Sequence, residues 1–123
     1  MRPLLDTNAV LRYVLNDVPD QSEEVRLVVT RGADTTPEAL CECVYVLTGS
    51  YYALPRADVS RALSLALEDI GCEHLHTMRK ALDLFATNNL DFVDCIFAAR
   101  ADVEHVRVLT FDKRLRRLLE DLG

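Results

Sequence analysis

The chain has 123 residues, of which 50% are hydrophobic and 28% are charged, and its formal net charge is −6 at pH 7. We expect a single domain over residues 1–123, because two separate cores would each be too small to offset their own chain entropy. The acidic balance argues against a protein that coats nucleic acid nonspecifically. No apolar run approaches the roughly 18 residues that span a bilayer, so we expect a cytoplasmic protein without a membrane partner.

The spacing of the four cysteines gives no sign of a zinc site or a redox pair. Cys41 and Cys43 lie two residues apart within a predicted helix, and Cys72 and Cys95 each stand alone in apolar surroundings. No CxxC pair and no histidine–cysteine ligand spacing occurs. We therefore expect reduced thiols, as in a cytosolic protein.

Apolar periodicity and turn residues divide the chain into helices that alternate with short strands. Helices are predicted over about 7–15, 20–31, 37–51, 55–70, 78–86, 88–101 and 113–122, the sixth being apolar nearly all round and therefore expected to lie centrally. Strands are predicted at 4–5, 32–36, 72–77 and 106–112, and the last of these has the clearest strand pattern after the first. This alternation predicts an α/β domain with a parallel sheet and helices on its faces.

Acidic residues stand where two of the predicted strands end. Asp6 comes at the carboxyl end of the first strand, and Asp112 follows the carboxyl end of the last. Because open parallel sheets bind ligands at the carboxyl ends of their strands, we expect these two side chains to converge.

Further acids fall on two predicted helices. Asp91 and Asp94 lie three residues apart in the first turn of one helix and are therefore neighbours there. Glu38 and Glu42 lie one turn apart on another helix, and helical geometry places Glu42 at the margin of its apolar stripe and Glu38 further toward solvent. Glu42 is therefore the better candidate for a site at the edge of the core.

Taken one at a time, these acids have ordinary structural explanations. Asp6, Asp91 and Asp112 are each suited to cap the helix that follows, and Glu42 is suited to be a surface charge. Together they are harder to explain, because two carboxylates 4 Å apart repel by ~1 kcal/mol in water and by ~4 kcal/mol at a partly buried site. A convergent cluster requires a cation, and hard oxygen ligands favour Mg²⁺ or Mn²⁺. Such sites hydrolyse phosphodiesters well.

Four segments in this order resemble the PIN-domain ribonucleases, and among these most closely the VapC toxins of bacterial toxin–antitoxin pairs. The segments are "LLDTNAVLRYVL", "ALCECVYVL", "LDFVDCIFAARA" and "VLTFDKRL", and the resemblance covers residues 4 to about 118. It implies a PIN-like three-layer α/β/α fold with a short central parallel sheet and about seven helices. It also implies a single domain that is active as a nuclease.

The resemblance assigns roles to individual residues. The catalytic and metal-binding quartet would be Asp6, Glu42, Asp94 and Asp112, with Glu42 either a metal ligand or the general base. Asn8 and Thr110 match polar positions that support the site, and Asp91 is a further supporting acid at a more variable position. The implied activity is Mg²⁺- or Mn²⁺-dependent cleavage of RNA, and the implied partners are a cognate VapB-like antitoxin and a second copy of the chain.

Basic residues near the quartet are candidates to bind the RNA backbone, although they also fit a solvated helix face. They are Arg12, Lys113, Arg114, Arg116 and Arg117.

Two other functions compete with the nuclease. A phosphatase of the haloacid-dehalogenase type also has an aspartate at the end of its first strand, but it needs a second acid two residues later, where this chain has Asn8. A catalytically silent protein-interaction module would use the acids only as caps and its apolar helices to bind a partner.

Overall fold

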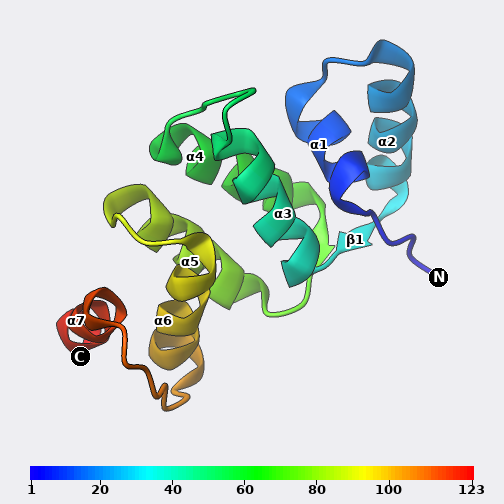
Figure 1. The fold of residues 1–123 in the computed structure, drawn as a ribbon. Coiled ribbons are helices and arrows are strands. Elements are labelled where there is room, and N and C mark those ends of the chain that lie inside the picture. Colours follow the sequence, from blue (N-terminus) through cyan, green and yellow to red (C-terminus); the bar gives the residue numbers. More distant parts are fainter.

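The computed structural model describes residues 1–123 as seven helices and one parallel pair of strands (Figure 1). In chain order the elements are α1 (Thr7–Leu15), α2 (Pro19–Arg31), β1 (Asp34–Thr35), α3 (Pro37–Thr48), α4 (Arg56–Asp69), β2 (Gly71–Cys72), α5 (Leu75–Thr87), α6 (Phe92–Glu104) and α7 (Lys113–Leu122). The predicted α/β class and the number of helices are confirmed, although the protein is mostly helical.

Side-chain caps fix the starts of three helices. Asp6, Thr36 and Asp112 each accept a hydrogen bond from the backbone N–H three residues later, at 2.9, 3.1 and 2.9 Å. These bonds satisfy amide groups that have no partner within the helix. The capping prediction is therefore confirmed for Asp6 and Asp112.

The sheet is smaller than the sequence predicts. β1 and β2 pair in parallel with Asp34 opposite Gly71, and the first predicted strand contributes only a single parallel bridge from Leu4 to Asp34. Residues 106–112, predicted as a clear strand, form no strand. The pattern there is right for a strand, but a strand exists only where a neighbouring backbone pairs with it, and none does so within this chain.

The segment after β2 also differs from the prediction. A strand was expected at 72–77, but the observed strand is Gly71–Cys72. Helix α5 begins at Leu75 rather than near residue 78. His74 adopts a left-handed backbone conformation with φ of 55°, which turns the chain from the strand into α5.

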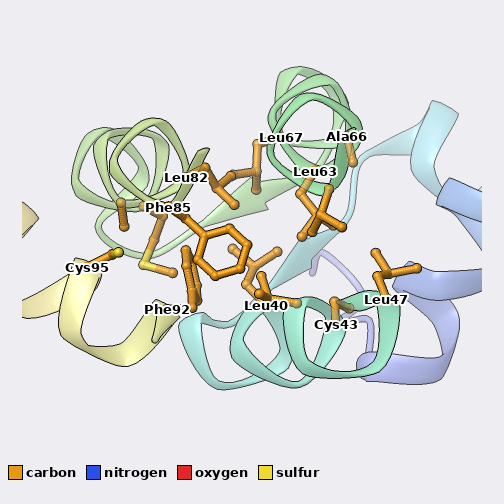
Figure 2. Packing of buried hydrophobic residues seen from close by; sticks show 14 of the residues in the cluster. Leu40, Cys43, Leu47, Leu63, Ala66, Leu67, Leu82, Phe85, Phe92 and Cys95 are labelled. Atoms are coloured by element: carbon orange, nitrogen blue, oxygen red, sulfur yellow. The ribbon is translucent and has the colours of Figure 1, made fainter. Parts of the chain in front are cut away.

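Much of the core lies between α3, α4, α5 and α6 (Figure 2), and the same buried cluster extends to α1, α2 and α7. Leu40, Leu63 and Leu82 are fully buried there, and the rings of Phe85 and Phe92 meet edge to face with centroids 5.8 Å apart. These contacts hold the start of α6 against the end of α5.

Helix α6 is buried on one face only, although its sequence is apolar nearly all round. This corrects the expectation that it lies centrally in the fold. Cys95 and Ala98 are buried, whereas Val93 and Phe97 are about half exposed. The apolar side chains on its second face are therefore only partly covered within the chain.

All four cysteines are free thiols, as predicted. Burial, followed by the nearby carboxylates of Glu42 and Asp6, raises the pKa of the Cys43 thiol to about 12. No helix combines the length and the apolar character that a membrane span requires.

Candidate acidic site

Asp6 stands exposed at the start of α1. Its Oδ1 accepts the N–H of Ala9 at 2.9 Å. This bond uses one carboxylate oxygen and fixes the direction of the side chain, so capping the helix and serving a site are compatible roles for Asp6.

Glu42 is joined to the start of α1 by a residue that the sequence reasoning missed. Thr7 Oγ1 donates a hydrogen bond to Glu42 Oε1 at 2.9 Å, and the Cys43 thiol lies 3.7 Å from the Thr7 carbonyl oxygen. The carboxylates of Asp6 and Glu42 both act on the pKa of Cys43, so both lie near this thiol. We call Asp6, Thr7 and Glu42 the first acidic group. A hydroxyl directly after Asp6 was the available signal for Thr7.

Asp94, Asp91 and Asp112 form a second acidic group, in which the first two lie at the amino-terminal end of α6 and the third at that of α7. Partial burial raises the pKa of the Asp94 carboxyl above its ordinary value, and the negative charges of Asp112 and then Asp91 raise it further. Asp112 caps α7, whereas Asp91 precedes α6 without making a side-chain cap hydrogen bond. The capping explanation therefore fails for Asp91, whose charge instead acts on Asp94.

The two predicted supporting residues have different surroundings. Thr110 Oγ1 accepts the N–H of Asp112 at 3.0 Å, so it shapes the turn that presents this acid. Asn8 lines an open cavity of about 230 Å³ together with Asp6 and Arg12.

The structure brings the four predicted acids together in pairs but does not unite them. Asp6 lies with Glu42, and Asp94 lies with Asp112, whereas no group of three or more histidine, cysteine, aspartate or glutamate side chains is placed to hold a metal ion. The carboxylate oxygens suit Mg²⁺ or Mn²⁺ chemically. Their placement within one chain does not form a complete site for either ion.

Basic and amide side chains, together with Asp121, line a cavity near the second acidic group. This cavity of about 340 Å³ lies between the start of α7 and the loop before α6, and it is lined among others by Asn88, Asn89, Lys113, Arg114 and Arg117. We call it the basic cavity. The two asparagines were not among the predicted site residues.

The five predicted RNA-binding residues differ in their availability. Arg114 donates to the Asn89 carbonyl oxygen and Arg116 to that of Thr110, while Arg12 is largely buried and pairs with Asp17 at 3.3 Å. Lys113 and Arg117 form no ion pair within the chain and are exposed. These two residues are the best placed to bind a phosphate.

Comparison with known proteins identifies the family. The PIN domain family matches residues 4–120, which is nearly the whole chain and includes both acidic groups. No curated protein and no solved structure gives a match. PIN domains are in general nucleases, and these nucleases generally use divalent metal ions. The chain therefore belongs to the PIN domain family.

Proposed function

We propose that the protein is a divalent-metal-dependent endoribonuclease that hydrolyses RNA phosphodiesters with water, and that it is the toxin of a type II toxin–antitoxin pair. The observation that carries the proposal is the family match over a chain whose four predicted acids all lie in one of two acidic groups. The cofactor proposed is Mg²⁺ or Mn²⁺, which activates water and stabilises negative charge on a phosphodiester when carboxylates hold it.

The chain's own side chains divide the work between the two groups. Thr7 holds Glu42 Oε1, which leaves Oε2 to bind the ion or to accept the proton of the attacking water. Partial burial raises the pKa of Asp94 first, and the charges of Asp112 and then Asp91 raise it further; a cation bound beside these carboxylates would offset that repulsion.

The basic cavity offers a path for the RNA backbone. Lys113 and Arg117 present positive charge beside Asn88 and Asn89, whose amide groups both donate and accept hydrogen bonds. Lys113 follows Asp112 directly in the chain, so a phosphate bound in the cavity lies next to the second acidic group. Phosphate contacts of this kind position nucleic acid without reading its sequence.

The proposed partners are an RNA substrate, a cognate VapB-like antitoxin that silences the enzyme, and a second copy of the chain. The antitoxin proposal draws support from apolar side chains that remain exposed. Tyr45, Val93 and Phe97 are exposed on α3 and α6, and a cavity of about 320 Å³ lies between these helices.

The test is RNA cleavage by the wild-type protein and by Asp6→Asn, in Mg²⁺ and in EDTA. Asparagine caps a helix about as well as aspartate, so this change removes the charge and keeps the start of α1. We expect cleavage by the wild type in Mg²⁺ alone, and a loss of about 100-fold or more in the variant. Glu38→Gln on the exposed side of α3 is the matched control and should cleave normally. Equal cleavage by the wild type and Asp6→Asn would contradict the proposal.

A silent interaction module is the second candidate, and one observation favours it. No group of three acids is placed to hold a metal ion within the chain, and Asp6 and Asp112 do act as caps. A protein of this kind would show no RNA cleavage with Mg²⁺ or Mn²⁺, and it would keep the apolar surface of α3 and α6 for a partner.

A further inference from the structure

Arg56 is placed where its charge does not suit its own helix. It is the first residue of α4, and the positive end of a helix dipole lies at that terminus. Pro55, which precedes it, makes no side-chain cap hydrogen bond. The contacts that stabilise the Arg56 side chain lie outside α4, in the segment that leads from α5 to α6.

The guanidinium of Arg56 bridges two backbone carbonyl groups. Its Nε donates a hydrogen bond to the Phe85 carbonyl oxygen at 2.8 Å, and its Nη2 donates one to the carbonyl oxygen of Leu90. The Phe85 carbonyl belongs to the last turn of α5, where it has no partner within the helix. The guanidinium also lies over the Phe85 ring, 3.6 Å from its centroid. Arg56 therefore ties the end of α5 to a carbonyl in the loop that follows.

This loop comprises residues 88–91, and we call it the α6 loop. Asn88 and Asn89 line the basic cavity, and Asp91 at the end of the loop belongs to the second acidic group. A second arginine also holds the loop, since Arg114 of α7 donates to the Asn89 carbonyl oxygen at 3.0 Å. The positions of the two asparagine amides and of Asp91 therefore depend on bonds that arginines make to the backbone of the loop.

The start of α6 depends on the same contacts. Asp91 occupies the cap position without making a side-chain cap hydrogen bond, and Asp94 lies in the first turn. The rings of Phe85 and Phe92 meet edge to face and attach this turn to α5 (Figure 2). Because Arg56 contacts both the ring and the carbonyl group of Phe85, it supports the ring contact and the loop that together direct Asp94.

We propose that Arg56 is a positioning residue for metal-dependent RNA cleavage, an inference that rests on the proposed function. Its bridge holds the α6 loop, so that the carboxylates of Asp91 and Asp94 are directed toward a shared cation and the asparagine amides toward the RNA backbone. Arg56 contacts neither and acts only through the backbone that it binds. A lysine cannot replace it, because one ammonium group does not present the planar pair of donors that spans two carbonyls.

Arg79 offers a matched control for the loss of a contact between an arginine and a carbonyl group. It lies on α5, and its Nη2 donates to the Leu67 carbonyl oxygen in the last turn of α4 at 3.1 Å. Both arginines are half-buried, but Leu67 lies in neither acidic group. Arg56→Met and Arg79→Met each remove the guanidinium and keep an unbranched apolar chain. Both variants should lower Tm to a similar extent.

Hydrogen exchange measured by mass spectrometry reports on the α6 loop without any assay of activity. We expect the amides of residues 88–94 to exchange about 10-fold faster in Arg56→Met than in the wild type, because a hydrogen bond from a charged donor is lost. The same amides should exchange at the wild-type rate in Arg79→Met. Unchanged exchange in Arg56→Met would overturn the proposal.

RNA cleavage in Mg²⁺ and calorimetric titration with Mn²⁺ then test the positioning role. Arg56→Met should cleave saturating RNA about 10-fold more slowly and bind Mn²⁺ about 10-fold more weakly, whereas Arg79→Met should match the wild type in both measurements. Cleavage by Arg56→Met as fast as that by Arg79→Met would overturn the proposal.

Arg56→Lys separates the bridge from the charge. This variant keeps the positive charge and should cleave as slowly as Arg56→Met, and it replaces that variant in every comparison if Arg56→Met does not fold. Full cleavage by Arg56→Lys would show that the charge alone is sufficient, and it would overturn the proposed bridge.

Failure of the proposed function is recognised in the wild type itself. A wild type that neither cleaves RNA nor binds Mn²⁺ removes the proposed function and the role of Arg56 within it. An active wild type whose rate does not depend on the Arg56 bridge overturns this inference alone and leaves the proposed function intact.

Discussion

Thr7 Oγ1 donates a hydrogen bond to Glu42 Oε1 at 2.9 Å and so joins the first turn of α1 to the middle of α3. Both residues lie at the surface, where a single hydrogen bond contributes only about 0.5–1.5 kcal/mol to stability. The bond matters more for the direction of Glu42, because a carboxylate that binds an ion or accepts a proton must be held in place.

Thr7→Val therefore separates positioning from stability. We expect RNA cleavage to fall by about 10-fold, since misplaced catalytic groups lose rate steeply. Thermal denaturation should show only a small change in Tm. Thr30→Val removes a comparable surface hydroxyl on α2 and should leave cleavage unchanged. A normal rate for Thr7→Val would mean that the bond has no part in the reaction.

Asp94→Asn is predicted to stabilise the fold. The pKa of Asp94 is raised in the folded protein, so the folded state favours the protonated carboxyl and the charged form opposes folding at neutral pH. Replacing it with an amide should raise stability by about a few tenths of a kcal/mol, because the group is partly solvated. Urea denaturation at neutral pH measures the change, with Asp83→Asn on exposed α5 surface as the control. A less stable Asp94→Asn would contradict this account.

Glu104 gives the opposite pH dependence. Its pKa is lowered, first by the hydrogen bond from Thr77, then by that from His74 and by the charge of Arg100. A lowered carboxyl pKa contributes stability that is present above the ordinary value and is lost as the pH falls through the folded value. Tm should therefore decline in acid, and Glu104→Gln should flatten that decline. Glu68→Gln, without such partners, should not; equal curves for both variants would refute the assignment.

The basic cavity predicts a salt dependence. Lys113→Ala and Arg117→Ala should each weaken RNA binding and reduce the slope of log affinity against log salt by about one. Arg31→Ala changes a surface charge at the end of α2 and serves as the control. Fluorescence anisotropy with a labelled RNA at several salt concentrations measures both quantities. Binding that does not depend on salt would exclude a role for these residues in phosphate recognition.

Local signals in the sequence predicted much of the helical structure. Asp6 and Asp112 cap helices and Pro37 begins one, as their chemistry indicates, because caps depend on only a few neighbouring residues. The prediction of a strand at 106–112 was wrong because it depended on distant residues. Its pattern is local, whereas its existence depends on a partner that the sequence does not specify.

The candidate site was predictable as a set of residue types but not as an arrangement. The strand-end argument expected Asp6 to meet Asp112, whereas Asp112 lies near Asp94 and Asp6 lies near Glu42. The pairing of Asp6 with Glu42 follows from how α1 packs on α3. The sequence did not predict the contact of Thr7 with Glu42, because a threonine in the first turn of a helix usually bonds only to nearby residues. Whether the two groups meet depends on long-range packing, which periodicity does not encode.

Calorimetric titration of Mn²⁺ into the wild type and into Asp6→Asn tests most directly whether the four predicted acids share a divalent ion. We predict a saturable heat for the wild type that is lost or strongly reduced in the variant. The same ion at about 100 times its Kd should stabilise the wild type by ~2.7 kcal/mol. A wild-type protein that gives neither heat nor a shift in Tm would contradict the account.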